Sequence, residues 1–213
     1  MKLIDHSVRE FVREVDSASP APGGGSVSAV AAAMGNGLLR MLGHLTIPKK
    51  KFKKLDEETQ QAFISIHEKL KNHSNKLLDL TDRDTDAFND IMHAFKMPKE
   101  TDAEKKKRTK AIEQATLKAI EVPEGIADTA YEALKTADFI RRHGNQNALS
   151  DVGVGALMLY AGLEGACLNI KINLSGLSDD TLKAAYRDKV ETLMHDAKTM
   201  TDQLLKAIHE SLA

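Results

Sequence analysis

Asp82, Asp84 and Asp86 lie within five residues and form the part of the sequence best suited to proton transfer. In a helix, Asp82 and Asp86 would share a face at positions i and i+4. Like charges this close raise the pKa of one carboxyl, which suits a general acid or base. A calcium-binding loop is excluded, because Ala87 replaces the glycine at its sixth position and His93 the acid at its twelfth. The alternative interpretation is a solvated acidic turn.

A glycine-rich turn, Gly23-Gly24-Gly25, follows Pro22 and leads through Ser26 into an apolar segment. Consecutive glycines expose backbone N–H groups, and a helix N-terminus favours anions, so a carboxylate or a developing oxyanion could bind there. The spacing differs from that of a nucleotide-binding P-loop, which needs a lysine and a hydroxyl residue after the second glycine. A tight turn between packed helices is the alternative.

A second polar cluster follows Gly144 and contains Asn145, Asn147, Ser150 and Asp151. Asparagine amides can pair with the donor and acceptor edge of a heterocycle. Capping the helix that starts here would need only one of these side chains. The cluster is therefore a candidate binding site, with simple capping as the alternative.

Lys49, Lys50 and Lys51 form a basic run that continues with Lys53 and Lys54. Such a run can bind a polyanionic tail, although a solvated loop is the commoner explanation. We therefore consider both interpretations for this segment.

Asn169 and Asn173 could line a cleft or end a helix. The eight histidines form no metal signature, because His67-Glu68 lacks the second histidine of His-Glu-x-x-His and the sequence has no Cys/His cluster. We therefore expect a site without a metal.

The elements that position these residues are predicted to be helices. Aromatic residues make up only 4% of the 213 residues and Trp is absent, which favours closely packed helices over a β-sandwich. The formal net charge of −1 provides no overall field for binding nucleic acid or an anionic membrane. Cys167 is the single cysteine, so no internal disulfide can form, and its apolar surroundings indicate an inert core thiol. The amino terminus lacks the apolar region of a signal peptide, and we expect a cytoplasmic protein.

Hydrophobic periodicity and start and stop signals predict an all-α bundle of six to seven helices in one domain, residues 1–213. Ser26 is expected to cap the second helix, and Pro123 to interrupt or kink the fourth. Val27–Ile47 is long and apolar, but Arg40 within it favours a buried helix over a membrane span. The expected helices cover residues 3–17, 27–46, 56–95 with a possible break near 81–82, 101–143, a segment from 150, and a last one from 178.

Six stretches of the sequence resemble the cyclodeaminase/cyclohydrolase family of folate enzymes. One motif alone would be weak, but these occur in the family's order and spacing and extend over nearly the whole chain. They are Ser19–Ser26, Leu45–Phe52, Asp84–Phe88, Met97–Lys99, Gly144–Asp151 and Leu168–Leu174.

The resemblance implies an all-helical homodimer that binds a tetrahydrofolate derivative without a metal or another cofactor. Two reactions follow from it. A cyclodeaminase closes 5-formiminotetrahydrofolate to 5,10-methenyltetrahydrofolate and releases ammonia, and this is the preferred prediction. A cyclohydrolase, the alternative, interconverts the methenyl form with 10-formyltetrahydrofolate. A non-enzymatic helical module that binds folate or a partner is the third possibility.

In this reading Asp86 is the general acid and base, and Asp151 its partner or an anchor for the pterin. Ser26, with the amides of the glycine turn, orients the reacting region. Asn145 and Asn147 hold the pterin edge, and the lysine run binds the glutamate tail. The further candidates for substrate binding are Asp82, Ser150, Asn169 and Asn173.

Overall fold

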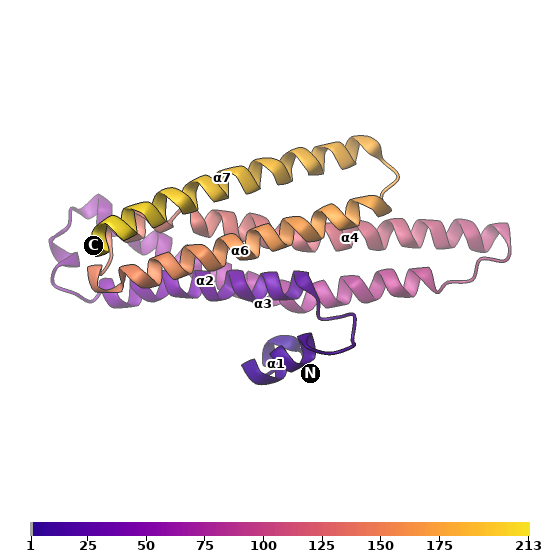
Figure 1. The fold of residues 1–213 in the computed structure, drawn as a ribbon, viewed down its shortest axis with the longest axis horizontal. Coiled ribbons are helices and arrows are strands. Elements are labelled where there is room, and N and C mark those ends of the chain that lie inside the picture. Colours follow the sequence, from indigo (N-terminus) through magenta and orange to yellow (C-terminus); the bar gives the residue numbers. More distant parts are fainter. Residues whose placement is uncertain (1) are drawn as a thin grey trace.

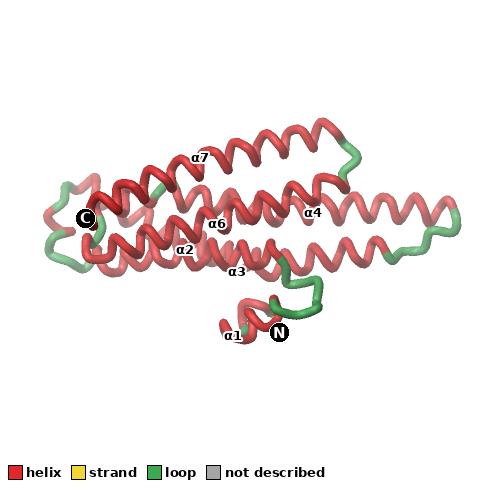
Figure 2. The backbone as a smooth tube through the Cα atoms, in the orientation of Figure 1, coloured by secondary structure: helices red, strands yellow, loops and turns green. Residues whose placement is uncertain are grey.

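The computed structural model describes residues 2–213, and in this part of the chain it contains seven α-helices and no strand. Four long helices run side by side in an elongated bundle, α7 lies along it, and short α1 lies beside it (Figure 1). Most of the loops lie toward the two ends of the bundle, whereas the loop between α1 and α2 lies beside its middle (Figure 2). The helices are α1 (Val8–Val15), α2 (Gly24–Thr46), α3 (Glu57–Phe95), α4 (Asp102–Leu134), α5 (Ala137–His143), α6 (Leu149–Asn173) and α7 (Asp180–Leu212). The predicted all-α class is confirmed.

Side-chain caps set several of the helix starts. A capping box starts α4: Glu104 N donates to Thr101 Oγ1, and the Glu104 carboxylate accepts from Thr101 N. Asp56 caps α3 in the simpler way, by accepting from Thr59 N. These bonds satisfy amide groups that have no partner inside a helix.

The two helices rich in small residues, α2 and α6, form the centre of the bundle. They run antiparallel, because Gly35 lies against Gly155 while Ser28 lies against Gly162. A Cβ atom at Gly162 would lie 2.6 Å from the Ser28 carbonyl oxygen, so a larger residue would force the helices apart. The packing of the two backbones therefore depends on glycine at this crossing.

Two predicted interruptions are absent. Helix α3 continues through Thr81, whose buried side chain donates to the Leu77 carbonyl within the helix. Helix α4 continues through Pro123, which is itself buried among the core residues, so packing compensates for the lost backbone hydrogen bond. The break falls instead at residues 135–136, before α5.

Several helix starts also differ from the prediction. Helix α2 begins at Gly24 with Gly23 as its cap, because the Ser26 hydroxyl is bonded to α3 instead. The first predicted helix is a short 3₁₀ turn followed by α1, which Ser7 caps. The last helix is capped by Asp179 rather than by Ser178, whose hydroxyl donates to Glu113.

The most apolar helical stretch, Gln146–Gly176, has the length and composition of a membrane span, and half of its most apolar window is buried in the bundle. It contains α6, which packs against α2, α4 and α7 as a core helix does. Cys167 on this helix is fully buried, and burial raises the pKa of its thiol to about 11, so it stays protonated at neutral pH.

Candidate functional site

Most of the predicted site residues line one of two cavities at opposite ends of α2. One, the glycine cavity, lies at the start of α2, and the other, the lysine cavity, lies just beyond its end. Helix α2 has 23 residues, so the two lie roughly 33 Å apart at the α-helical rise. One protomer therefore does not bring the glycine turn and the lysine run together.

The glycine cavity has a volume of about 170 Å³ and is formed where the glycine turn faces α3, α4 and α6. Its walls are mostly apolar, with three polar side chains among them. The lining residues are Pro20, Ala21, Gly23, Gly24, Gly25, Asp84, Phe88, Ile91, Ala119, Asn169 and Asn173.

Asp84 is the only ionisable side chain among the described residues that line the glycine cavity. Its Oδ2 atom lies 3.0 Å from Ser26 Oγ, which can donate to it. A Cβ atom at Gly25 would overlap the Asp84 carboxylate, so the third glycine of the turn makes room for this side chain. Burial raises the pKa of Asp84, and its contacts with Ser26 oppose this effect only in part. A carboxyl whose pKa is raised is better suited to exchange a proton with a substrate than a fully solvated one.

Asn169 and Asn173 complete the polar side of the glycine cavity. The amide nitrogen of Asn169 donates to the Gly165 carbonyl, and that of Asn173 donates to the Ala119 carbonyl. These bonds orient both side chains, which are half-buried. The amide oxygens are then the groups left to accept hydrogen bonds from a ligand.

The other acidic residues of the cluster do not face this cavity. Asp86 is exposed on α3, and Asp82 Oδ1 accepts from the Leu3 backbone N–H at 2.7 Å. The hydrogen bond from Leu3 ties the start of the chain to α3. The predicted pairing of Asp82 with Asp86 on one helix face therefore does not create a shared acid–base site inside the cavity.

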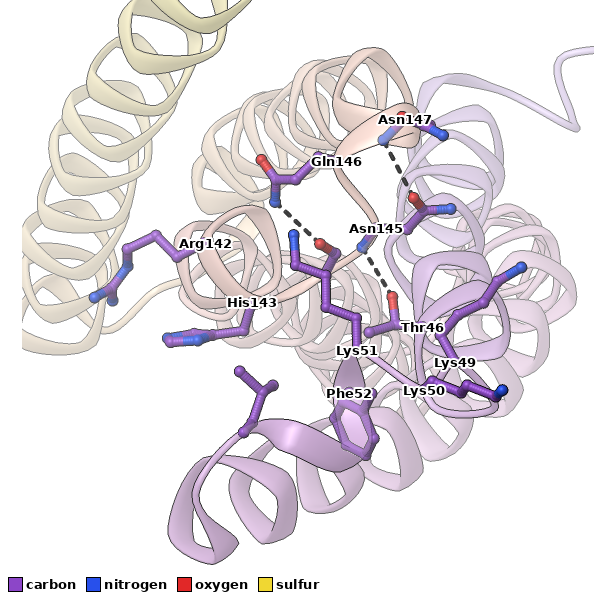
Figure 3. Close-up of a pocket in the computed structure, with 12 residues that line it drawn as sticks. Thr46, Lys49, Lys50, Lys51, Phe52, Arg142, His143, Asn145, Gln146 and Asn147 are labelled. Carbon is purple, nitrogen blue, oxygen red and sulfur yellow. Dashed lines mark hydrogen bonds between the residues drawn. The ribbon is translucent and has the colours of Figure 1, made fainter.

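The lysine cavity is larger, about 570 Å³, and lies between the end of α2 and the segment that joins α5 to α6. Figure 3 shows Lys51 extending toward Gln146, whereas Lys49 and Lys50 point away from that segment. No acidic residue is among the described residues that line this cavity, so its net charge is positive. The lining residues are Thr46, Lys49, Lys50, Lys51, Phe52, Leu55, Arg142, His143, Gly144, Asn145, Gln146 and Asn147.

The asparagines of the lysine cavity are held by local hydrogen bonds (Figure 3). Asn145 N donates to Thr46 Oγ1 at 2.9 Å, and the Asn145 amide oxygen accepts from Asn147 N. Ser150 and Asp151 lie in the first turn of α6 and are not part of the cavity lining. Asp151 is also far from the acidic cluster, because α6 runs antiparallel to α2 and ends, not begins, at the glycine cavity.

The sequence analysis did not single out Asp84, although a signal was available. The buried residues Leu77, Leu80, Thr81 and Ala87 of α3 define the face that packs in the core. Asp84 falls on this face at helical spacing, and Asp86 does not. Among the described residues, no three His, Cys, Asp or Glu side chains cluster so that they could hold a metal ion.

An all-helical bundle with a half-buried carboxyl in one small cavity, and a separate basic cavity, has the groups that proton transfer and anion binding require. Residues 7–192 match the family described as Formiminotransferase-cyclodeaminase. The chain belongs to this family.

Relatives of known function support this assignment. The chain is 36% identical to formimidoyltransferase-cyclodeaminase of Rattus norvegicus over 97% of its length, but spans only 37% of that longer protein. It is 31% identical to methenyltetrahydrofolate cyclohydrolase of Methylorubrum extorquens, with 96% of both chains covered. The crystal structure of formiminotetrahydrofolate cyclodeaminase from Thermotoga maritima has the same fold, with a TM-score of 0.77 at 24% identity and coverage of 98% and 96%.

Proposed function

We propose that this protein is a cytoplasmic formimidoyltetrahydrofolate cyclodeaminase. Folate cyclodeaminase or cyclohydrolase chemistry is consistent with the names of its relatives. The observation that carries the proposal within the site is the buried Asp84 carboxyl, whose pKa is raised by burial and which faces a cavity of polar amide groups. Both reactions need a group of this kind, because each moves a proton on and off nitrogen or oxygen.

In the proposed deamination, N10 of 5-formiminotetrahydrofolate attacks the carbon of the formimino group, whose nitrogen is already protonated. Asp84, ionised at the start, accepts the N10 proton and then gives it to the departing nitrogen. The bond from carbon to that nitrogen breaks, ammonia leaves, and the 5,10-methenyl ring remains. One carboxyl thus acts as base and then as acid, which requires a pKa between those of a free carboxyl and an amine.

Methenyltetrahydrofolate cyclohydrolase is the second candidate, because a relative of that name is 31% identical to this chain over 96% of both chains. In this reaction Asp84 would take a proton from the water that adds to the methenyl carbon. It would return that proton to N5 as the carbon–N5 bond breaks, and the second proton of the water would leave to solvent as the formyl C=O forms.

Ultraviolet absorbance of the methenyl group distinguishes the candidates. We expect purified protein to form the methenyl band from 5-formiminotetrahydrofolate, with an equal amount of ammonia. Loss of the band from added methenyltetrahydrofolate, faster than the spontaneous rate and without the first activity, would identify the cyclohydrolase instead. Saturable binding of folate without either reaction would leave a non-enzymatic binding module as the function.

We also propose a homodimer, because a long apolar stripe on α2 and α6 has no partner among the described residues. On α2 it consists of Val27, Met34 and Leu45, which are 38%, 51% and 38% exposed and lie on one line of the helix. On α6 it consists of Val154, Leu157, Leu168 and Ile172, which are 47%, 48%, 58% and 73% exposed. Apolar residues in such a continuous array are typical of an interface.

The proposed dimer axis crosses the middle of this stripe, perpendicular to α2. A twofold axis there places Leu45 of one protomer over Val27 of its partner. The lysine cavity of one protomer then lies beside the glycine cavity of the other. In this arrangement the pterin and the reacting carbon bind near Asp84, Asn169 and Asn173, while the glutamate tail extends into the partner's basic cavity.

Replacing Lys49, Lys50 and Lys51 by alanine together is expected to raise KM for a polyglutamylated folate about tenfold or more, because three cations would be lost from the tail site. The effect should be smaller with a monoglutamate, and it should shrink at high salt. Steady-state kinetics with both substrates measures this. Unchanged affinity for the polyglutamylated folate would refute binding of the tail by these lysines.

A further inference from the structure

The hydroxyl of Ser26 lies between two acceptors on α3. Ser26 Oγ is 2.9 Å from the Thr81 carbonyl oxygen and 3.0 Å from Asp84 Oδ2, and Thr85 Oγ1 lies 3.3 Å away. Ser26 is fully buried, so no bulk water competes for these contacts. A serine has one hydroxyl hydrogen and can donate to only one of the two acceptors at a time.

The two protonation states of Asp84 need opposite arrangements of this hydrogen. When Asp84 is ionised, donation from Ser26 Oγ to Oδ2 adds to the bond from the Ser26 backbone N–H and stabilises the charge, because a partly buried carboxylate is costly without donors. When Asp84 carries the proton on Oδ2, the carboxyl itself donates to Ser26 Oγ. The Ser26 hydrogen is then free to donate to the Thr81 carbonyl.

We infer that Ser26 is a positioning residue whose hydroxyl hydrogen turns from Thr81 to Asp84 and back as Asp84 releases and regains its proton. No covalent bond to Ser26 forms, and the transferred proton moves only between Asp84 and the substrate. The inference rests on the proposed acid–base role of Asp84, and it removes Ser26 from contact with the substrate. It also explains why α2 begins at Gly24, which places Ser26 in its first turn.

The surroundings of Asp84 leave Ser26 as its main polar neighbour. The side chains that face Asp84 from α4 and α6 are uncharged, and the nearby acids of its own helix are directed elsewhere, Asp82 toward the Leu3 N–H and Asp86 into solvent. Burial raises the pKa of Asp84, and Ser26 supplies the contacts that lower it. Removing the Ser26 hydroxyl should therefore raise the pKa of Asp84.

Carbon-13 NMR of protein labelled in its aspartate carboxyl groups tests this directly, with the Asp84 signal assigned by its absence from Asp84→Asn. In Ser26→Ala we expect the titration midpoint of Asp84 to rise by about one to two pH units, the loss of one hydrogen bond to a charged group. Ser28→Ala is the matched control. Ser28 is a buried serine two residues further along α2. Its hydroxyl donates to the Gly24 carbonyl rather than to Asp84.

The midpoint in Ser28→Ala should stay at its wild-type value. Equal midpoints in Ser26→Ala and the wild type, or equal shifts in both serine variants, would overturn the inference. If Ser26→Ala does not fold, Ser26→Cys gives the same test with a smaller expected shift, because a thiol is a weaker donor.

The pH dependence of kcat separates this inference from the proposed function. We expect the profile of Ser26→Ala to move in the same direction as the midpoint, with little change in KM. The Asp84 midpoint could rise in Ser26→Ala while the wild-type protein converts neither 5-formiminotetrahydrofolate nor methenyltetrahydrofolate. That result would reject the proposed function but support the role of Ser26. Normal turnover with an unmoved midpoint would reject the role of Ser26 alone.

Discussion

Asp84→Asn is expected to lower kcat by about 10²–10⁴-fold, the usual contribution of a general acid–base group. Asparagine has nearly the same shape as aspartate and keeps an oxygen that can accept from Ser26. It cannot take up or release a proton at neutral pH, so substrate should still bind. Steady-state kinetics on the preferred substrate measures the loss of kcat. A separate binding measurement shows whether substrate binding is retained.

Asp86→Asn is the matched control, because it makes the same chemical change two residues away at an exposed position. The sequence analysis assigned the acid–base role to Asp86, so the pair of variants decides between the two carboxyls. Near wild-type turnover in Asp84→Asn together with a large loss in Asp86→Asn would reverse the proposal made here.

The stability of Asp84→Asn gives an independent check on the burial of the carboxyl. The pKa of Asp84 is raised in the folded state, so the group favours folding when it is protonated, and that contribution is lost as the pH rises through the folded pKa. At pH 7, above the pKa of the unfolded chain, the raised pKa of Asp84 is therefore a cost to the fold. We expect Asp84→Asn to be at least as stable as the wild type at pH 7, and this advantage to disappear in acid.

Mixing two impaired variants is expected to restore activity when it is measured well below KM. Asp84→Asn lacks the acid–base group, and the triple Lys49, Lys50 and Lys51 alanine variant lacks the basic cavity. If each site combines Asp84 of one protomer with the lysines of the other, a mixed dimer contains one intact and one doubly altered site. Random exchange of subunits should then give about a quarter of wild-type activity at low substrate concentration.

The control for this experiment prevents dimer formation. Met34→Glu with Leu157→Glu places two charges on the apolar stripe, so the chain should become monomeric in sedimentation and no activity should return on mixing. Leu78→Glu alters a residue of similar exposure, 40%, on α3 outside the stripe, and should leave the dimer intact. If the whole site lay within one protomer, no mixture would recover activity. This would include the mixture of Asp84→Asn with the triple lysine variant in which the apolar stripe is unaltered.

Local signals in the sequence were sufficient for the fold class and for most of the helices. Aromatic residues are scarce throughout the chain, and two further signals act within a few residues: the helical spacing of apolar residues and the capping residues Thr101 and Glu104. The helix boundaries that differ from the prediction lie where tertiary contacts dominate. Pro123 stays inside α4 because it is buried, and Ser26 lies within α2 because its hydroxyl is used by α3.

The site was harder to predict, because its chemistry depends on which carboxyl is buried. Asp82, Asp84 and Asp86 are the same residue type at alternate positions, and nothing in their composition separates them. The registry of α3 against the glycine turn places only Asp84 beside Ser26 and Gly25, and desolvation there raises its pKa.

The sequence by itself determined the helical class, the family resemblance and the residue types available for proton transfer and anion binding. Only the tertiary structure decided which acid is buried and that the glycine turn and the lysine run lie at opposite ends of α2. The physical reason is that propensity and capping are local, whereas burial and distance depend on how helices far apart in the sequence pack together.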